Sequence, residues 1–128
     1  MTKEENRFLR YWLPLYSWMG VIFFLSSIPQ AFMPEFIAEF KIDKLTHFLE
    51  YLILGALLVR AFLHSDLEIE LGGSVLIAVG VALVFAALDE GYQYFVPGRT
   101  ADLADWLCDS LGSASGIVLY FIGTLSSE

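Results

Sequence analysis

Four long apolar segments constrain this chain more than any other feature of its sequence. They run about 11–28, 45–63, 71–95 and 104–125. An α-helix needs roughly 17–25 mainly apolar residues to cross the hydrocarbon core of a bilayer, and each segment is close to that length. A helix also satisfies its backbone hydrogen bonds within one segment. The sequence therefore predicts an all-α polytopic membrane protein, a four-transmembrane-helix bundle that forms a single domain over residues 1–128.

The composition supports this interpretation and argues against nucleic acid as a partner. Hydrophobic residues make up 57% of the chain and charged residues only 17%, which is less charge than the surface of a soluble domain requires. The formal net charge is −8, whereas phosphate backbones are bound by basic surfaces. We therefore expect membrane lipids, and no nucleic acid, among the partners.

The basic residues favour an orientation with both termini in the cytoplasm. With the N-terminus inside, the cytoplasmic basic residues are Lys3, Arg7, Arg10 and Arg60, and the outer ones are Lys41, Lys44 and Arg99. Basic residues concentrate on the cytoplasmic side, and those beside the first helix usually dominate. We therefore expect an N-in, C-in protein whose loops 29–44 and 96–102 lie outside.

Ionisable and polar residues collect at the end of the predicted bundle where these two loops lie. They are Asp43, Lys44, His47, Glu50, Asp89, Glu90, Gln93, Arg99, Asp102, Asp105 and Asp109. An ionisable residue within a membrane segment costs about 2.5–3.5 kcal/mol on insertion scales and usually marks a site. The asymmetry predicts a polar pocket at the outer membrane face.

Helical spacing places many of these residues on the inner faces of three segments. The three stripes, each with the three-and-four rhythm of one helix face, are His47, Glu50, Tyr51, Leu54 and Leu58; then Ala78, Ala82, Ala86, Asp89 and Gln93; then Asp105, Asp109, Gly112, Gly116 and Gly123. Small residues allow membrane helices to pack closely. We therefore expect the carboxylates at the ends of these stripes to point into the bundle.

Structural roles also remain open for several of these residues. Asp102 could simply cap the fourth helix, with Asp105 in its first turn. Asp109 lies roughly 10 Å further along that helix at 1.5 Å per residue, which is too deep for a cap.

For other residues the expected partner is open. His47 could merely extend to the membrane interface, and Arg99 could pair with Asp89 or Asp105. Asp89 and Glu90 are adjacent and cannot point the same way, so we expect one to serve the site and the other a neighbouring backbone or basic group.

The first outer loop contains a second periodic pattern. Phe32, Phe36 and Phe40 recur every four residues, while Glu35 and Glu39 take the other side. This spacing predicts a short amphipathic helix at the membrane interface, placed to cover the pocket. A plain hydrophobic connector is the alternative.

Three stretches of the chain together match a known pattern. They are Leu25-Ser26-Ser27, Asp43-Lys44-x-x-His47-Phe48-x-x-Tyr51-x-x-x-Gly55, and Asp89-Glu90-x-x-Gln93-x-Phe95-Val96-Pro97-Gly98-Arg99 followed by Asp102, Asp105, Asp109 and Gly112. In these stretches the sequence resembles the VanZ-like family of bacterial membrane proteins, from about Trp12 to Ile122. The resemblance implies a bacterial cytoplasmic (inner) membrane protein and, through the founding member, a link to resistance against the glycopeptide teicoplanin. It implies no settled mechanism.

Three classes of function are compatible with these residues. The chain could bind or modify an envelope component, a lipid-linked precursor or a glycopeptide through the polar pocket. It could instead be a metal-dependent membrane enzyme that acts on a lipid-linked phosphate or glycosyl-phosphate. An ion pathway is disfavoured because the inner halves of the segments are apolar and offer no relay.

Residue chemistry suggests individual roles. The catalytic candidates are His47, Glu50, Asp89, Glu90, Asp105 and Asp109, and the binding candidates are Lys44, Tyr51, Gln93, Arg99 and Asp102. His47 could act as a general base or a metal ligand, and the planar guanidinium of Arg99 suits a phosphate. Several carboxylates in one shallow space must bind a cation or stay partly protonated. We expect a divalent cation held by Glu50, Asp89, Asp105 and Asp109, because hard divalent ions prefer carboxylate oxygens.

Overall fold

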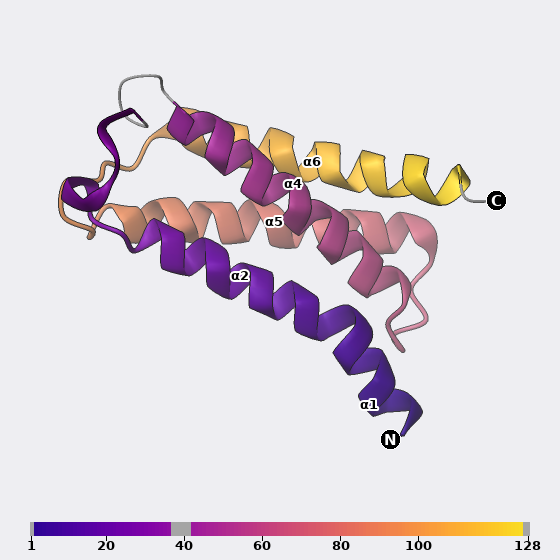
Figure 1. Cartoon of the computed structure of the whole chain (residues 1–128). Coiled ribbons are helices and arrows are strands. Elements are labelled where there is room, and N and C mark those ends of the chain that lie inside the picture. Colours follow the sequence, from indigo (N-terminus) through magenta and orange to yellow (C-terminus); the bar gives the residue numbers. More distant parts are fainter. Residues whose placement is uncertain (1, 37–41, 127–128) are drawn as a thin grey trace.

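The computed structural model describes residues 2–36 and 42–126, and the long elements in these ranges are all helices (Figure 1). The elements are α1 (Lys3–Arg7), the π-helical turn η1 (Phe8–Trp12), α2 (Leu13–Ser26), the 3-10 turn η2 (Gln30–Phe32), α4 (Ile42–Leu63), α5 (Leu71–Gln93) and α6 (Leu103–Leu125). Four helical segments, Lys3–Ser26, Ile42–Leu63, Leu71–Gln93 and Leu103–Leu125, are long and apolar enough to cross a membrane. The predicted fold class, an all-α four-helix membrane bundle, is confirmed.

The first membrane segment begins earlier than the apolar run that predicted it. Thr2 and Glu5 form a capping box, in which each side chain accepts a hydrogen bond from the other residue's backbone N–H, and this starts the helix among charged residues. The π-helical turn lies just before Pro14, whose ring removes a donor from the helical ladder. The segment ends at Ser26, three residues before Pro29.

The loops 29–44 and 96–102 differ in how far they match the prediction. Of the predicted amphipathic helix, Glu35 and Phe36 are helical, whereas Phe32 lies in the 3-10 turn η2. Its remaining residues, including Glu39 and Phe40, lie outside the described residues. The second loop turns at Gly98, which has a positive φ of 77° and therefore adopts a conformation that favours glycine. Gln30 donates its backbone N–H to Pro97, so the two loops are joined.

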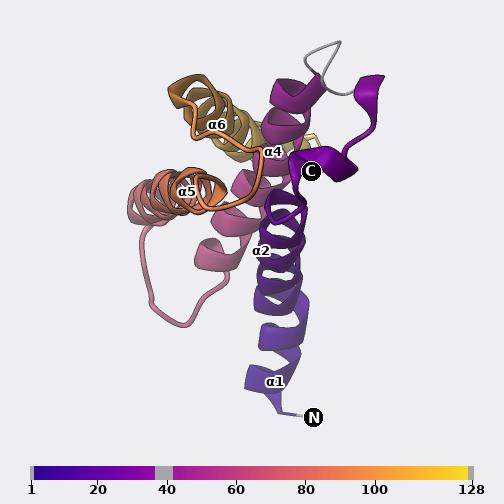
Figure 2. The same ribbon diagram turned by 90° about the vertical axis from the view of Figure 1, so that its left-hand side faces the viewer.

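The other three membrane segments pack around α4. Helix α4 contacts α2, α5 and α6, and α5 also contacts α2 and α6. Helices α2 and α6 do not contact each other within the described ranges, and Figure 2 shows them on different sides of α4. Both described ends of the chain lie at the end of the bundle opposite the joined loops (Figure 1).

Helices α4 and α6 approach so closely that their backbones touch at glycines. A Cβ on Gly112 would overlap the carbonyl of Phe48, and a Cβ on Gly116 would overlap the carbonyl of Leu52. The predicted small-residue seam of α6 is therefore present up to Gly116. Its extension to Gly123 is wrong, because Gly123 is exposed and a Cβ there would meet open space.

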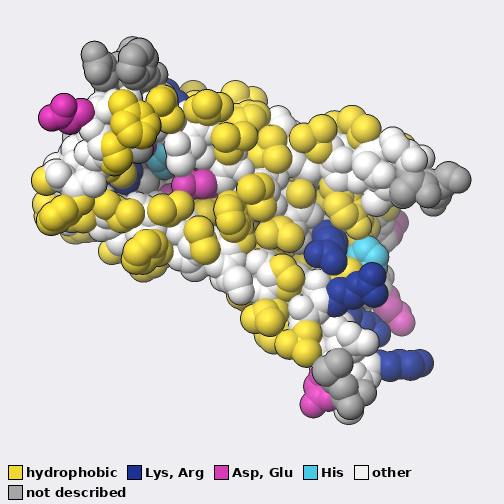
Figure 3. All heavy atoms as spheres, viewed as in Figure 1, with side chains coloured by type: hydrophobic (Ala, Val, Ile, Leu, Met, Phe, Trp, Pro, Cys, Tyr) yellow, Lys and Arg dark blue, Asp and Glu magenta, His cyan; other side chains and the backbone are white. Residues whose placement is uncertain are grey.

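The surface is apolar in the middle and polar at both ends. Figure 3 shows hydrophobic side chains over the central part of one face, with charged side chains at its two ends. At the end where the loops join, a histidine side chain and acidic side chains are visible between hydrophobic side chains. This distribution suits a bundle that crosses a bilayer.

Candidate functional site

A buried histidine–aspartate pair joins α4 to α6. His47 Nδ1 lies 3.0 Å from Asp109 Oδ1, and the two residues are 3% and 0% exposed. Their positions follow from the stripes, because His47 is near the start of α4 and Asp109 is in the second turn of α6. The alternative in which His47 extends to the membrane interface is wrong, since its ring turns inward.

Lys44 and Asp102 form the polar rim above this pair. The Lys44 ammonium donates to Asp105 Oδ1 at 2.6 Å and to Asp102 Oδ2 at 3.0 Å. Asp102 is also the N-cap of α6, because its Oδ1 accepts the backbone N–H of Ala104 at 2.9 Å. These two interactions, first the backbone N–H and then the ammonium, hold the pKa of Asp102 below its usual range. The alternative in which Asp102 caps the fourth helix is confirmed.

Asp89 and Glu90 diverge, as their adjacency predicts. Asp89 Oδ2 accepts the hydroxyl of Ser26 at 2.9 Å, and Ser26 accepts from Gln93 Nε2 at 3.3 Å. Glu90 Oε2 accepts the backbone N–H of Asp102 at 3.0 Å, so Glu90 is the acid that serves a neighbouring backbone.

Ser26 and Asp43 were given no catalytic, binding or metal-ligating role by sequence reasoning, although Asp43 was counted among the polar residues of this end. Ser26 is buried at the last turn of α2, and Asp43 stands one turn before His47 on α4. Both lie in the stretches that carry the family resemblance, which was the available signal. Their side-chain types alone gave no signal of a functional role, since serine at a helix end and aspartate in the first turn of a helix are common.

Arg99 has different partners from those predicted. Its Nε donates to the carbonyl of Ile28 at 3.2 Å and an Nη donates to the carbonyl of Leu25 at 3.3 Å. Its other Nη lies 3.9 Å from Asp43 Oδ1. Pairing of Arg99 with Asp89 or Asp105 is therefore wrong. The last carbonyls of a helix have no partner within it, and the joined loops bring the guanidinium to the end of α2.

A small cavity opens beside these groups. Its volume is about 160 Å³, and its lining residues are Leu25, Ser26, Ile28, Met33, Pro34, Asp43, Thr46, His47, Glu50 and Arg99. Glu50 is 7% exposed and lines the cavity, and in the part of the chain that the structure describes only its backbone carbonyl accepts a side-chain hydrogen bond, from Trp18. Tyr51 and Gln93, two predicted binding residues, are buried and do not line the cavity, so a ligand in the cavity would not touch them directly.

The buried carboxylates are only partly compensated. Asp89 Oδ1, Glu90 Oε1 and Asp109 Oδ2 have no hydrogen-bond partner among residues 2–36 and 42–126. Two like charges 4 Å apart repel by about 4 kcal/mol even at an effective dielectric of 20. These acids must therefore share protons or face a cation.

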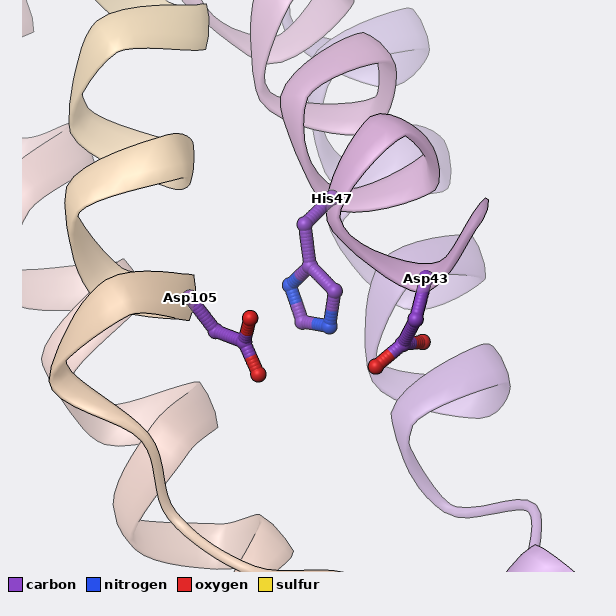
Figure 4. Close-up of side chains that lie close together, drawn as sticks. All are labelled: Asp43, His47 and Asp105. Atoms are coloured by element: carbon purple, nitrogen blue, oxygen red, sulfur yellow. The ribbon is translucent and has the colours of Figure 1, made fainter. Parts of the chain in front are cut away.

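Two groups of side chains have the spacing of metal ligands. Asp43, His47 and Asp105 form the outer triad (Figure 4), and His47, Asp89 and Asp109 form the inner triad, each with ligand atoms within 4.8 Å of one another. The predicted ligand set of Glu50, Asp89, Asp105 and Asp109 is divided between the triads, and Glu50 belongs to neither. The sequence did not show that His47 would lie at their junction.

Comparison with known proteins agrees with the resemblance noted in the sequence. No curated protein and no solved structure matches the chain significantly. The family model VanZ/LLP1 matches residues 4–124. Because this match covers nearly the whole chain, the protein with this four-helix bundle and buried polar end belongs to the VanZ/LLP1 family.

Proposed function

We propose that this protein binds the phosphate-bearing headgroup of a lipid-linked envelope component in the cavity, at the outer face of the bacterial cytoplasmic membrane. The observation that carries the proposal is the position of Arg99. Its side chain is 6% exposed and lines the cavity, and its nearest acid is 3.9 Å away, beyond hydrogen-bond distance. A guanidinium has five N–H donors, so Arg99 has donors left after it binds the carbonyls of Leu25 in α2 and of Ile28 just beyond it.

The rest of the cavity wall suits an amphipathic ligand. Leu25, Ile28 and Met33 are apolar, whereas His47 and Glu50 are polar. A phosphate could contact Arg99 while the first carbons of a lipid chain lie against the apolar side chains, because buried apolar area and charge-assisted hydrogen bonds would both favour binding.

The size of the cavity argues against direct enclosure of a glycopeptide. Pockets that bury drug-sized ligands have volumes of roughly 300–1,000 Å³, whereas this cavity has about 160 Å³. A link to teicoplanin resistance would therefore act through an envelope component.

An enzyme that acts on the same lipid phosphate is the second candidate. Asp109 fixes the ring of His47, and His47 lines the cavity. A histidine oriented by a carboxylate is the arrangement that activates water in many hydrolases, either as a base or beside a metal.

Ligand titration of the purified protein in detergent tests the proposed binding. Farnesyl phosphate should bind more tightly than farnesol, and inorganic phosphate should bind weakly because it lacks the lipid chain. Arg99→Gln should weaken farnesyl phosphate binding about tenfold or more, since a hydrogen bond to a charged group contributes about 1.5–3 kcal/mol. Release of phosphate from farnesyl phosphate would favour the enzyme.

Arg60→Gln is the matched control, because Arg60 lies in the last turn of α4 at the other end of the bundle. It should leave the affinity unchanged. Equal binding of farnesol and farnesyl phosphate, or equal losses in the two arginine variants, would contradict the proposal.

A further inference from the structure

The outer triad brings three side chains from two helices around one point. Asp43 and His47 are four residues apart on α4, so they share a face of that helix, and Asp105 comes from the first turn of α6. Figure 4 shows the imidazole of His47 between the two carboxylates. The triad also borders the cavity, because Asp43 and His47 line it, which gives an ion a route from the membrane surface.

The orientation of His47 suits a metal ligand. Its Nδ1 faces Asp109, and a neutral imidazole that donates from Nδ1 keeps a lone pair on Nε2. Within the described residues only Nδ1 of His47 makes a hydrogen bond, so the Nε2 lone pair is left for an ion, and the residue as a whole is only 3% exposed. Metal-binding histidines commonly donate their second ring nitrogen to a carboxylate, which fixes the ring and raises its basicity. Asp109 occupies that position.

We propose that Asp43, His47 Nε2 and Asp105 bind one divalent transition-metal ion, Zn²⁺ or Mn²⁺. Carboxylate oxygens alone would favour Mg²⁺ or Ca²⁺, whereas an imidazole nitrogen in the set favours transition metals. Three protein ligands leave at least one coordination position for water or a ligand, and the cavity lies beside it. The site does not depend on the proposed lipid ligand, so the ion should bind in its absence.

The outer triad is favoured over the inner one because it leaves existing interactions in place. Lys44 occupies only Oδ1 of Asp105, so Oδ2 remains for an ion. Binding at the inner triad through Nδ1 would instead break the hydrogen bond between His47 and Asp109. An ion at the outer triad would also lower the negative potential around the unpaired Asp109 Oδ2.

Metal titration of the full chain, tag-free and metal-stripped in detergent, tests the proposal. Zn²⁺ and Mn²⁺ should each bind at about one ion per chain and at least about tenfold more tightly than Mg²⁺ or Ca²⁺, because of the imidazole ligand. Electron spin-echo spectroscopy of the Mn²⁺ complex should show coupling to an imidazole nitrogen. That measurement uses the wild-type protein and does not depend on whether a variant folds.

Asp105→Asn and Asp102→Asn form a matched pair. Both remove one negative charge beside Lys44, and asparagine at position 102 keeps the N-cap. Asp105→Asn should weaken Zn²⁺ binding about tenfold or more, the scale on which even outer-shell changes act, while Asp102→Asn should change it far less. Equal losses in the pair, no nitrogen coupling, or no preference for Zn²⁺ and Mn²⁺ would overturn the proposal.

Discussion

Ser26 lies at the last turn of α2, where its hydroxyl donates to Asp89 and accepts from Gln93. All three residues are buried, and Asp89 Oδ1 has no further partner among the described residues. Among the described side chains, the Ser26 hydroxyl is the donor that lies within hydrogen-bond distance of this carboxylate. Removal of one partner from a buried polar group costs more than the hydrogen bond itself contributes, so Ser26 should matter more for stability than its size suggests.

Ser26→Ala should therefore lower the free energy of unfolding by about 1–3 kcal/mol, because it leaves the Asp89 carboxyl without its donor. The adjacent Ser27→Ala is the control. Ser27 donates to the carbonyl of Phe23 in the same helix, can accept from the Tyr92 hydroxyl and is partly exposed, so we expect a loss of about 0.5 kcal/mol or less. Thermal or denaturant unfolding of the purified variants, followed by circular dichroism, measures both. A similar loss in the two variants would be inconsistent with this role.

The site residues differ in how far they could be predicted. His47, Asp89 and Asp109 stand on helical stripes, so periodicity alone predicts that they face inward. The partners of Arg99 depend on where α2 ends and on how the two loops join, which they do through the hydrogen bond between Gln30 and Pro97. These are contacts between residues about seventy positions apart, and no local pattern encodes them.

At the scale of elements, the contact between α4 and α6 sets the geometry of the site. Lys44 and His47 come from α4, and their partners Asp105 and Asp109 come from α6. The helices approach closely because Gly112 and Gly116 face carbonyls of α4. A wider separation would lengthen the 3.0 Å contact between His47 and Asp109, so these glycines support the site although they do not touch it.

Gly116→Ala should lower the free energy of unfolding by about 1–3 kcal/mol, as overpacking does elsewhere, because its Cβ would overlap the carbonyl of Leu52. Gly123→Ala on the same helix meets open space. It should be neutral or stabilising by up to about 1 kcal/mol, the difference in helix propensity. Unfolding in mixed micelles compares the pair, and a destabilised Gly123→Ala with an unaffected Gly116→Ala would refute this description of the seam.

The limits of the membrane-spanning helices were largely predictable from the apolar composition that a bilayer requires. Apolar runs reveal the membrane-spanning part, so the second, third and fourth helices begin and end within a few residues of the predicted limits. Charged residues at positions 3–10 concealed the start of the first helix, although Thr2 and Glu5 have the spacing of a capping box.

At the scale of the whole molecule, the two polar ends differ in character. The end away from the cavity has surface interactions: Arg7 pairs with Asp66, His64 stacks on Tyr11 with ring centroids 4.3 Å apart, and the Arg60 guanidinium lies 5.0 Å from the centre of the Tyr11 ring. Basic residues concentrate there, which favours the cytoplasmic side. We infer that the cavity faces outward.

Cysteine labelling tests this orientation. In a Cys108→Ser background, Thr100→Cys in the loop after α5 should react with an impermeant maleimide in intact cells. Ser65→Cys in the loop after α4 should react only after the membrane is disrupted, because that loop would lie in the cytoplasm. The reverse pattern would invert the orientation and place the cavity inside.

The sharing of the site between α4 and α6 has a consequence for biogenesis. Synthesis proceeds from the N-terminus, so α4 reaches the membrane two helices before α6. During that interval His47 lacks Asp109, and Lys44 lacks both of its carboxylate partners. Unpaired ionisable groups are costly in hydrocarbon. Insertion of α6 therefore lowers the free energy of these unpaired groups by supplying their partners. The polar site and the completed bundle then form in the same step.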